Sequence, residues 1–128
     1  MKTIFVSIFL LISTTAFSQR FYDGSGRQVA RFDDNRIYNS SGKQIGRIDG
    51  ERIYDASGHQ IGRVDGNLFY DGSGHQIGRV DGNYLYGASG KQIGRLDGDN
   101  LYEASGHQIG RADGLRRMQV IIFFYYFY

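Results

Sequence analysis

The stretch YDASGHQIGRVDG, from Tyr54 to Gly66, decides the fold because the chain repeats it with a period of 16 residues. Six copies cover residues 21–116, and they begin at Phe21, Ile37, Ile53, Phe69, Leu85 and Leu101. Each copy carries two turn signals, Asp-Gly and Ser-Gly, separated by short runs rich in Ile, Val, Tyr and Phe. The pattern predicts an all-β antiparallel meander of about twelve short strands.

The turn signals also predict the register and the two faces of the sheet. A two-residue loop centred on Asp-Gly sets Val64 opposite Asn67, and one centred on Ser-Gly sets Tyr54 opposite Ile61. One face then carries the Tyr, the Ile of Gln-Ile-Gly-Arg and the Arg of each copy, such as Tyr54, Ile61 and Arg63. The other face carries the leading apolar residue, the Gly before Arg and the residue before Asp-Gly. Because the period is even, every copy presents the same residues on the same face.

A flat sheet of so many strands would leave two open edges, so we expect closure. The repeated YDxSGxQIGRVDG unit, with an apolar leader and an aromatic end, resembles the bacterial beta-flower proteins. The resemblance implies hairpins radiating around a pseudo-symmetry axis in a four- or five-petalled ring, with no established activity. Six copies leave the petal number open. A shorter similarity, Tyr22-Asp23 with Arg27, links the chain to YD-repeat proteins, whose spacing differs from 16. A β-solenoid is the alternative fold.

The first 18 residues have the layout of a secretory signal peptide. Lys2 precedes an apolar run from Ile4 to Ile12, and Ala16 and Ser18 favour cleavage before Gln19. An uncleaved membrane anchor is the alternative, although the apolar run is short for one. We expect export across the inner membrane to the periplasm, the outer membrane or the extracellular space. The expected domains are the signal peptide 1–18, a repeat domain 19–117 and a C-terminal segment 118–128.

Charge and composition narrow the class of partner. Of the 15 Lys and Arg residues, Lys2 leaves with the leader, so 14 remain against 13 Asp and Glu. This near balance argues against a nucleic-acid partner. The chain contains no cysteine, so an exported protein of this size must be stabilised without disulfides. Repetitive packing is the expected substitute.

The last eleven residues, MQVIIFFYYFY, are nearly all apolar or aromatic. They are too few to span a bilayer as a helix, and a soluble protein would not leave them in water. Three positions are open for them: buried as the hub of the ring, paired with other copies of the chain, or inserted at a membrane. We favour the hub, because a ring of short Gly-rich hairpins otherwise buries little apolar surface.

The sequence offers no constellation for catalysis or cofactors. His59, His75 and His107 align with Arg27, Lys43 and Lys91, which is typical of a solvated basic position rather than a metal site. The aspartates of the Asp-Gly turns have turn chemistry to satisfy, which argues against calcium. Each Ser belongs to a turn, and no helix follows to form a nucleophile elbow. We therefore expect no enzyme, no metal and no cofactor.

Two side chains recur on one face and form a candidate ligand platform. Exposed tyrosines in a row would suit sugar rings, and a ring of arginines would suit an anionic group. The residues are Tyr38, Tyr54, Tyr70, Tyr86, Tyr102, Arg47, Arg63, Arg79 and Arg95.

The functional hypothesis is an exported, non-enzymatic structural or binding module of the bacterial cell envelope. The alternatives are a curli-like assembly subunit that self-associates through 118–128, and a multivalent glycan-binding module. Membrane contact through 118–128 is a further possibility.

Overall fold

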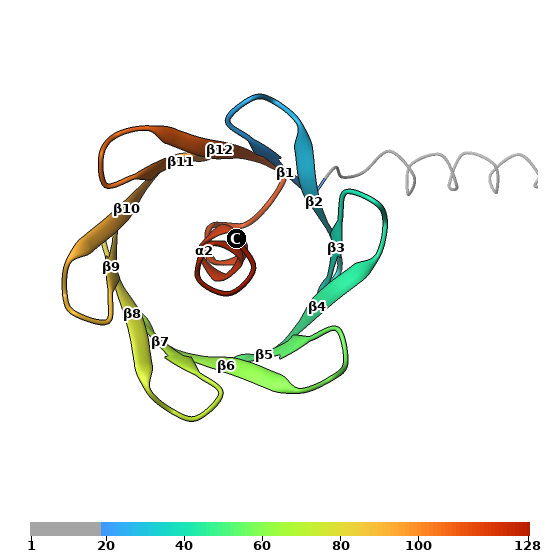
Figure 1. Cartoon of the computed structure of the whole chain (residues 1–128), viewed down its shortest axis with the longest axis horizontal. Coiled ribbons are helices and arrows are strands. Elements are labelled where there is room, and N and C mark those ends of the chain that lie inside the picture. The colour runs from blue at the N-terminus through green and yellow to red at the C-terminus, as the bar shows by residue number, and fades with distance from the viewer. Residues whose placement is uncertain (1–18) are drawn as a thin grey trace, which may run out of the picture.

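Twelve short strands form a closed ring around a central helix, as the computed structural model of the chain shows for residues 19–128 (Figure 1). The strands are β1 (Arg20–Asp23), β2 (Gln28–Asp33), β3 (Arg36–Asn39), β4 (Gln44–Asp49), β5 (Arg52–Asp55), β6 (Gln60–Asp65), β7 (Leu68–Asp71), β8 (Gln76–Asp81), β9 (Tyr84–Gly87), β10 (Gln92–Asp97), β11 (Asn100–Glu103) and β12 (Gln108–Asp113). Each strand pairs antiparallel with its neighbours in sequence, and β1 pairs with β12 to close the ring. The predicted closed meander is confirmed, and the β-solenoid alternative is wrong. The expected leader 1–18 lies outside the described residues.

The ring has six petals in the part of the chain that the structure describes. A petal is the hairpin closed by a Ser-Gly loop, such as β5 with β6, and the petals are numbered 1 to 6 along the chain. Their loops splay outward around the ring in Figure 1. The Asp-Gly turns join one petal to the next and lie at the opposite rim. Each 16-residue copy therefore supplies one petal, including the first and last copies.

The Ser-Gly loops correct the predicted register. Ile53 does oppose Gly62, but Tyr54 opposes Gln60 instead of Ile61, because the ladder shifts between Ile53 and Tyr54. The loop is one residue longer than expected, with Gly58 at φ 93°, and Ile61 absorbs the extra residue in a bulge. The bulge compensates the odd loop, so every copy keeps its faces.

The Asp-Gly turns correct the register at the other rim. Val64 opposes Phe69 and Asp65 opposes Leu68, so the two central residues are Gly66 and Asn67 instead of Asp65 and Gly66. Among residues 19–128, positive φ occurs only at glycines and at Asp34, so only the first central position of this turn has positive φ. That geometry fits type II′ rather than the expected type I′. Each residue of β6 therefore pairs with the residue two positions further along β7 than predicted. Because a shift of two residues keeps side chains on the same side of a strand, the predicted faces are unchanged.

The central helix α2 (Arg117–Tyr126) fills the ring, which confirms the expected hub. Val120, Ile121, Ile122 and Phe123 are buried there against the inner face of the strands. A ring of twelve strands is too wide for side chains alone to fill, whereas a helix with its side chains is about 10 to 12 Å across. A helix also satisfies its own backbone hydrogen bonds in a dry interior. The helical form of this segment differs from the sequence-based expectation, which gave the hub no helix.

Among residues 19–128, no helix is both long and apolar enough to cross a membrane.

Candidate functional site

Six Arg–Tyr stacks lie on the outside of the ring, and the nine predicted platform residues belong to five of them. The guanidinium carbon of each Arg lies 4.2 to 4.6 Å from the centre of a Tyr ring, from Arg31 over Tyr38 to Arg111 over Tyr22. The strand register explains the contact, because Arg63 of petal 3 is directly opposite Tyr70 of petal 4. Each stack therefore joins two neighbouring petals.

Carboxylates extend these stacks in the middle petals. Arg47 lies 3.6 Å from Asp49 and Arg95 lies 3.4 Å from Asp97, as expected for residues two apart on one face of a strand. The stacked tyrosines are half-buried, and the Arg covers one side of each ring. This arrangement holds the petals together and leaves little open aromatic surface.

The inner face of the ring explains the glycine before each Arg. A side chain on Gly62 would overlap the ring of Tyr126, and one on Gly78 would overlap the ring of Tyr125. Phe127 covers Gly46 in the same way, and a side chain on Gly94 would come within 3.3 Å of the Phe124 ring. Four consecutive aromatic residues of the C-terminal segment thus seat on four consecutive petals. The repeat itself marks this glycine, but the aromatic residue that covers it lies outside the repeat.

Petals 1 and 6 are filled differently. Petal 1 has Ala30 in place of the glycine, and it is fully buried. Phe123 contacts Phe21 and Phe32 there, with ring centres 5.1 and 6.5 Å apart. In petal 6, the side chain of Phe21 covers Gly110. The joint between the two ends of the ring is therefore packed by the first strand as well as by the helix.

Two tyrosines of the C-terminal segment also form hydrogen bonds at the joints between petals, which are the places where the last strand of one petal pairs with the first strand of the next. The Tyr125 hydroxyl donates to the carbonyl oxygen of Tyr86 at 2.7 Å and lies 3.1 Å from that of Arg79. Tyr126 does the same at the preceding joint, 2.7 Å from the Tyr70 carbonyl oxygen and 3.3 Å from that of Arg63. Inner hydroxyls and outer Arg–Tyr stacks thus bridge the same joints.

Stability should fall at alkaline pH because of these two tyrosines. Burial raises the pKa of Tyr125 and of Tyr126 to about 12, from the ordinary value of 10.0. Between these values the unfolded chain loses protons that the folded chain keeps, so rising pH favours unfolding. We expect urea midpoints to drop between pH 10 and 12. A variant carrying Tyr125→Phe and Tyr126→Phe should drop less across that interval, even if it starts less stable. Equal drops would contradict this assignment.

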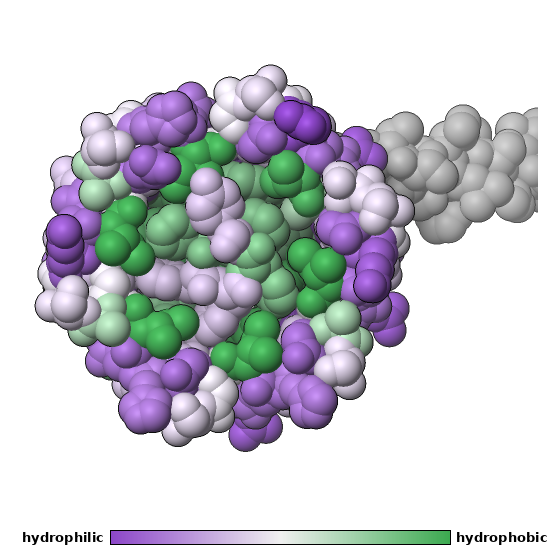
Figure 2. All heavy atoms as spheres, viewed as in Figure 1, coloured by the Kyte–Doolittle hydropathy of each residue, from purple (hydrophilic) through white to green (hydrophobic). Residues whose placement is uncertain are grey.

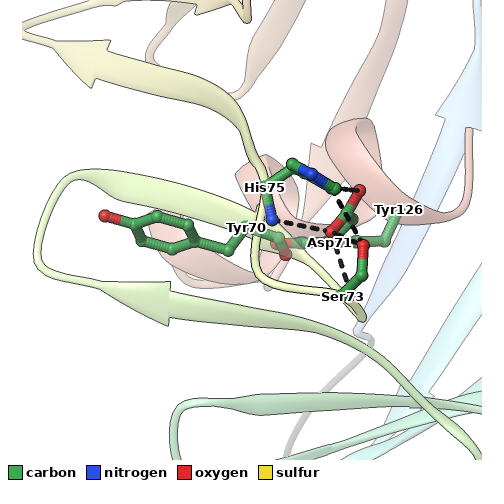
Figure 3. A network of polar contacts seen from close by, with 5 residues as sticks. All are labelled: Tyr70, Asp71, Ser73, His75 and Tyr126. Carbon is green, nitrogen blue, oxygen red and sulfur yellow. Dashed lines mark hydrogen bonds and ion pairs between the residues drawn. The ribbon is translucent and has the colours of Figure 1, made fainter.

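The petal tips carry a repeated polar network (Figure 3). In petal 4, Asp71 Oδ1 accepts hydrogen bonds from the Ser73 hydroxyl and from the backbone N–H groups of Ser73 and His75, at 2.9 to 3.0 Å. These bonds, the His75 N–H first, lower the pKa of Asp71. The Tyr70 ring points away from this network, and Tyr126 reaches the strand from the helix side. This loop-capping role of the Asp that follows the Tyr was not predicted from the sequence, which drew attention to the Asp-Gly turns instead.

Ser73, His75 and Asp71 are the residue types of a hydrolase triad, but their bonds follow another order. The Ser73 hydroxyl donates its only hydrogen to Asp71, so His75 Nδ1, 3.0 Å from Ser73 Oγ, must be the donor in that contact. A base would have to accept that hydrogen from the serine. The group therefore orders an exposed loop, and Ser57 with His59 repeats it in petal 3.

Clefts lie between neighbouring petal tips. One of about 380 Å³ separates petals 2 and 3, and another of about 560 Å³ lies where petal 6 meets petal 1. In the described part of the chain, no three His, Cys, Asp or Glu side chains converge as a metal site. Figure 2 shows a polar rim around a more apolar centre at one end of the ring.

Comparison with known families agrees with this architecture. The family model for the 5-fold beta-flower protein matches residues 18–128. The chain belongs to that family. No curated protein and no solved structure matches it. The family description is five-fold, whereas this beta-flower closes with six petals in its described residues, one for each copy of the repeat.

Proposed function

We propose that this beta-flower is an exported, non-enzymatic binding module of the bacterial cell envelope, which holds its partner multivalently through the petal tips. One observation carries the proposal: a loop of the same geometry is presented six times around one rim of a ring. In petals 1 to 4 an Asp or Asn caps the loop with the same bonds, as Asp23 and Asn39 show. The apolar leader of residues 1–18 supports export.

The rigidity of the ring suits such a role. An Arg–Tyr stack joins each petal to the next, and tyrosine hydroxyls add bonds at two of these joints, so the loops are ordered before a ligand arrives. A preorganised surface loses little conformational entropy on binding. Six weak contacts to one polymer can raise the overall affinity by about 10² to 10⁴ over a single contact. Specialised chemistry in one copy is unnecessary for this mode of action.

Self-association is the second candidate, because apolar residues are exposed near the petal tips. Tyr128 is 65% exposed and Ile93 is 37% exposed. Closure of the ring leaves no free strand edge within residues 19–128, so the curli-like mode of strand addition finds no template in that part of the chain. Association would instead have to use the end of the ring.

The test is fractionation of cells that express the full chain, followed by cosedimentation of the purified protein with isolated envelope and with sacculi. We expect recovery in the envelope fraction and salt-resistant, saturable cosedimentation. Light scattering on the same sample should give a monomer. Retention in the cytoplasm, or no cosedimentation with any envelope component, would sink the binding proposal. A defined oligomer without envelope binding would favour self-association instead.

A further inference from the structure

The cleft between petals 2 and 3 combines apolar and polar groups from two copies of the repeat. Lys43, Gln44 and Ile45 line it from petal 2, and Asp55 and Ser57 line it from petal 3. Its volume of about 380 Å³ lies within the range of small-ligand sites, about 300 to 1,000 Å³. The cleft exists only because neighbouring petals splay, so it is a product of the closed ring.

The cleft between petals 6 and 1 repeats this design and adds an aromatic ring. His107, Gln108 and Ile109 take the places of the petal 2 residues, and Ser25 takes that of Ser57. Tyr128 also lines this cleft, and its ring stacks on Phe124 with centres 6.1 Å apart. At about 560 Å³ it is larger than the first. Tyr128 is 65% exposed, so one aromatic face is open to a ligand.

The glutamines in these clefts are held in one orientation. The Nε2 atoms of Gln44 and Gln108 donate to the carbonyl oxygens of Gly46 and Gly110, at 3.4 and 3.2 Å. Gln60 makes the same bond at 3.3 Å. These bonds leave Oε1 as a fixed acceptor in each case.

The remaining groups complete a mixed set of donors and acceptors. Asp55 Oδ1 is already occupied by the loop, and Oδ2 lies 3.8 Å from His59 Nδ1, so a ligand would reach this carboxylate beside the imidazole. A cationic or imidazole side chain, such as Lys43 or His107, supplies donors. A ligand that both donates and accepts, and that has an apolar C–H face for Ile45 or Tyr128, fits this set. Saccharides have these properties, whereas polyanions would meet the carboxylates.

We propose that the clefts between neighbouring petals bind short neutral or amino-substituted saccharides, with the strongest site between petals 6 and 1. The inference rests on the proposed binding function and places its ligand at the clefts rather than at the outer Arg–Tyr stacks. Each cleft binds weakly because it is open to solvent, and the ring gains affinity when a polymer occupies several clefts. The aromatic face of Tyr128 adds to the contacts available between petals 6 and 1.

The experiment is an NMR titration of protein purified after expression of the full chain, with β-1,4-linked tri-N-acetylglucosamine and maltotriose as probes. We expect shifts at Gln108, Ile109 and Tyr128 before those at the other petals. Tyr128→Ala should weaken binding by roughly fivefold, the size of one aromatic contact. Gln108→Ala should also weaken binding. Both side chains are exposed, so the fold should persist. Glu51→Gln, at the opposite rim, is the matched control and should change nothing.

Several results would overturn the inference. No shifts with either saccharide at millimolar concentrations would do so, as would shifts confined to the outer stacks around Tyr54 or Tyr70. Equal affinity in wild type, Tyr128→Ala and Gln108→Ala would do so as well. Cosedimentation with sacculi distinguishes failure of the cleft inference from failure of the proposed envelope-binding function. If all variants still cosediment, the module binds envelope elsewhere, and if wild type does not, both proposals fail.

Discussion

Removal of residues 118–128 is expected to unfold the ring. Val120, Ile121, Ile122 and Phe123 are buried against the strands, and each such side chain contributes roughly 1.5 to 3 kcal/mol. Together they supply at least about 6 kcal/mol, comparable to the whole stability of a small domain. Without them the inner face of twelve strands would be exposed to water. Circular dichroism and thermal denaturation should show no cooperative transition for the truncated chain.

The matched control is removal of Tyr128 alone. That residue is 65% exposed and lies beyond the end of α2, so the shorter truncation should melt close to wild type. A truncated ring that stays folded and monomeric without residues 118–128 would contradict the hub assignment. It would mean that the strands close on side chains of their own.

Gly62→Ala should destabilise the protein by about 2 kcal/mol or more, the usual scale for overpacking a filled core. The added methyl would overlap the Tyr126 ring, which is itself held by its hydroxyl bond to the Tyr70 carbonyl oxygen. The ring therefore cannot shift without losing that bond. Gly87→Ala is the control, because a Cβ there would overlap nothing: the nearest atom is a methyl carbon of Ile93 at 3.3 Å, a tight contact that a small shift of that side chain relieves. Urea unfolding of both variants measures the difference.

A double-mutant cycle sharpens this prediction. In a Tyr126→Ala background, Gly62→Ala should cost much less, since the clashing ring is gone. Additive costs in the cycle would show that Gly62 is required by the strand alone and does not seat the helix. Equal costs for Gly62→Ala and Gly87→Ala would point the same way.

The sequence was sufficient to predict the faces of the sheet. Parity alone places Arg63 and Tyr70 on one face and Val64 and Phe69 on the other, and both placements hold in the ring, although the predicted partners of these residues do not. The register itself was not predictable from the dipeptides, because Asp-Gly and Ser-Gly name a turn without fixing which residues are central. Ile61, taken as a regular strand residue, is the bulge that allows the longer loop.

The helical hub was predictable in position but not in conformation. Residues such as Val120, Ile121 and Phe124 favour strands intrinsically, and nothing local predicts a helix there. The enclosing ring decides instead, because it offers no strand partner inside and requires every backbone group to be satisfied. A signal was present: the run from Phe124 to Phe127 supplies one aromatic residue for each glycine from Gly94 back to Gly46.

The candidate site was only partly predictable. The recurring Tyr and Arg were found, yet their direct stacking depends on the register between petals, so an open platform was a natural expectation. The clefts were not predictable from the sequence, because they form between residues of different copies and their size depends on how far the petals splay. The polar positions that line the clefts recur in every 16-residue copy, so in the sequence they look like structural positions of the repeat.

The most direct test of the central helix is a set of nuclear Overhauser effects between ring protons of Tyr126 and the Hα protons of Gly62, recorded on a mixture of labelled and unlabelled protein. We predict strong effects within one molecule, with the same pattern between Tyr125 and Gly78. Their absence, or their appearance only between differently labelled copies, would contradict a ring that closes around its own C-terminal helix.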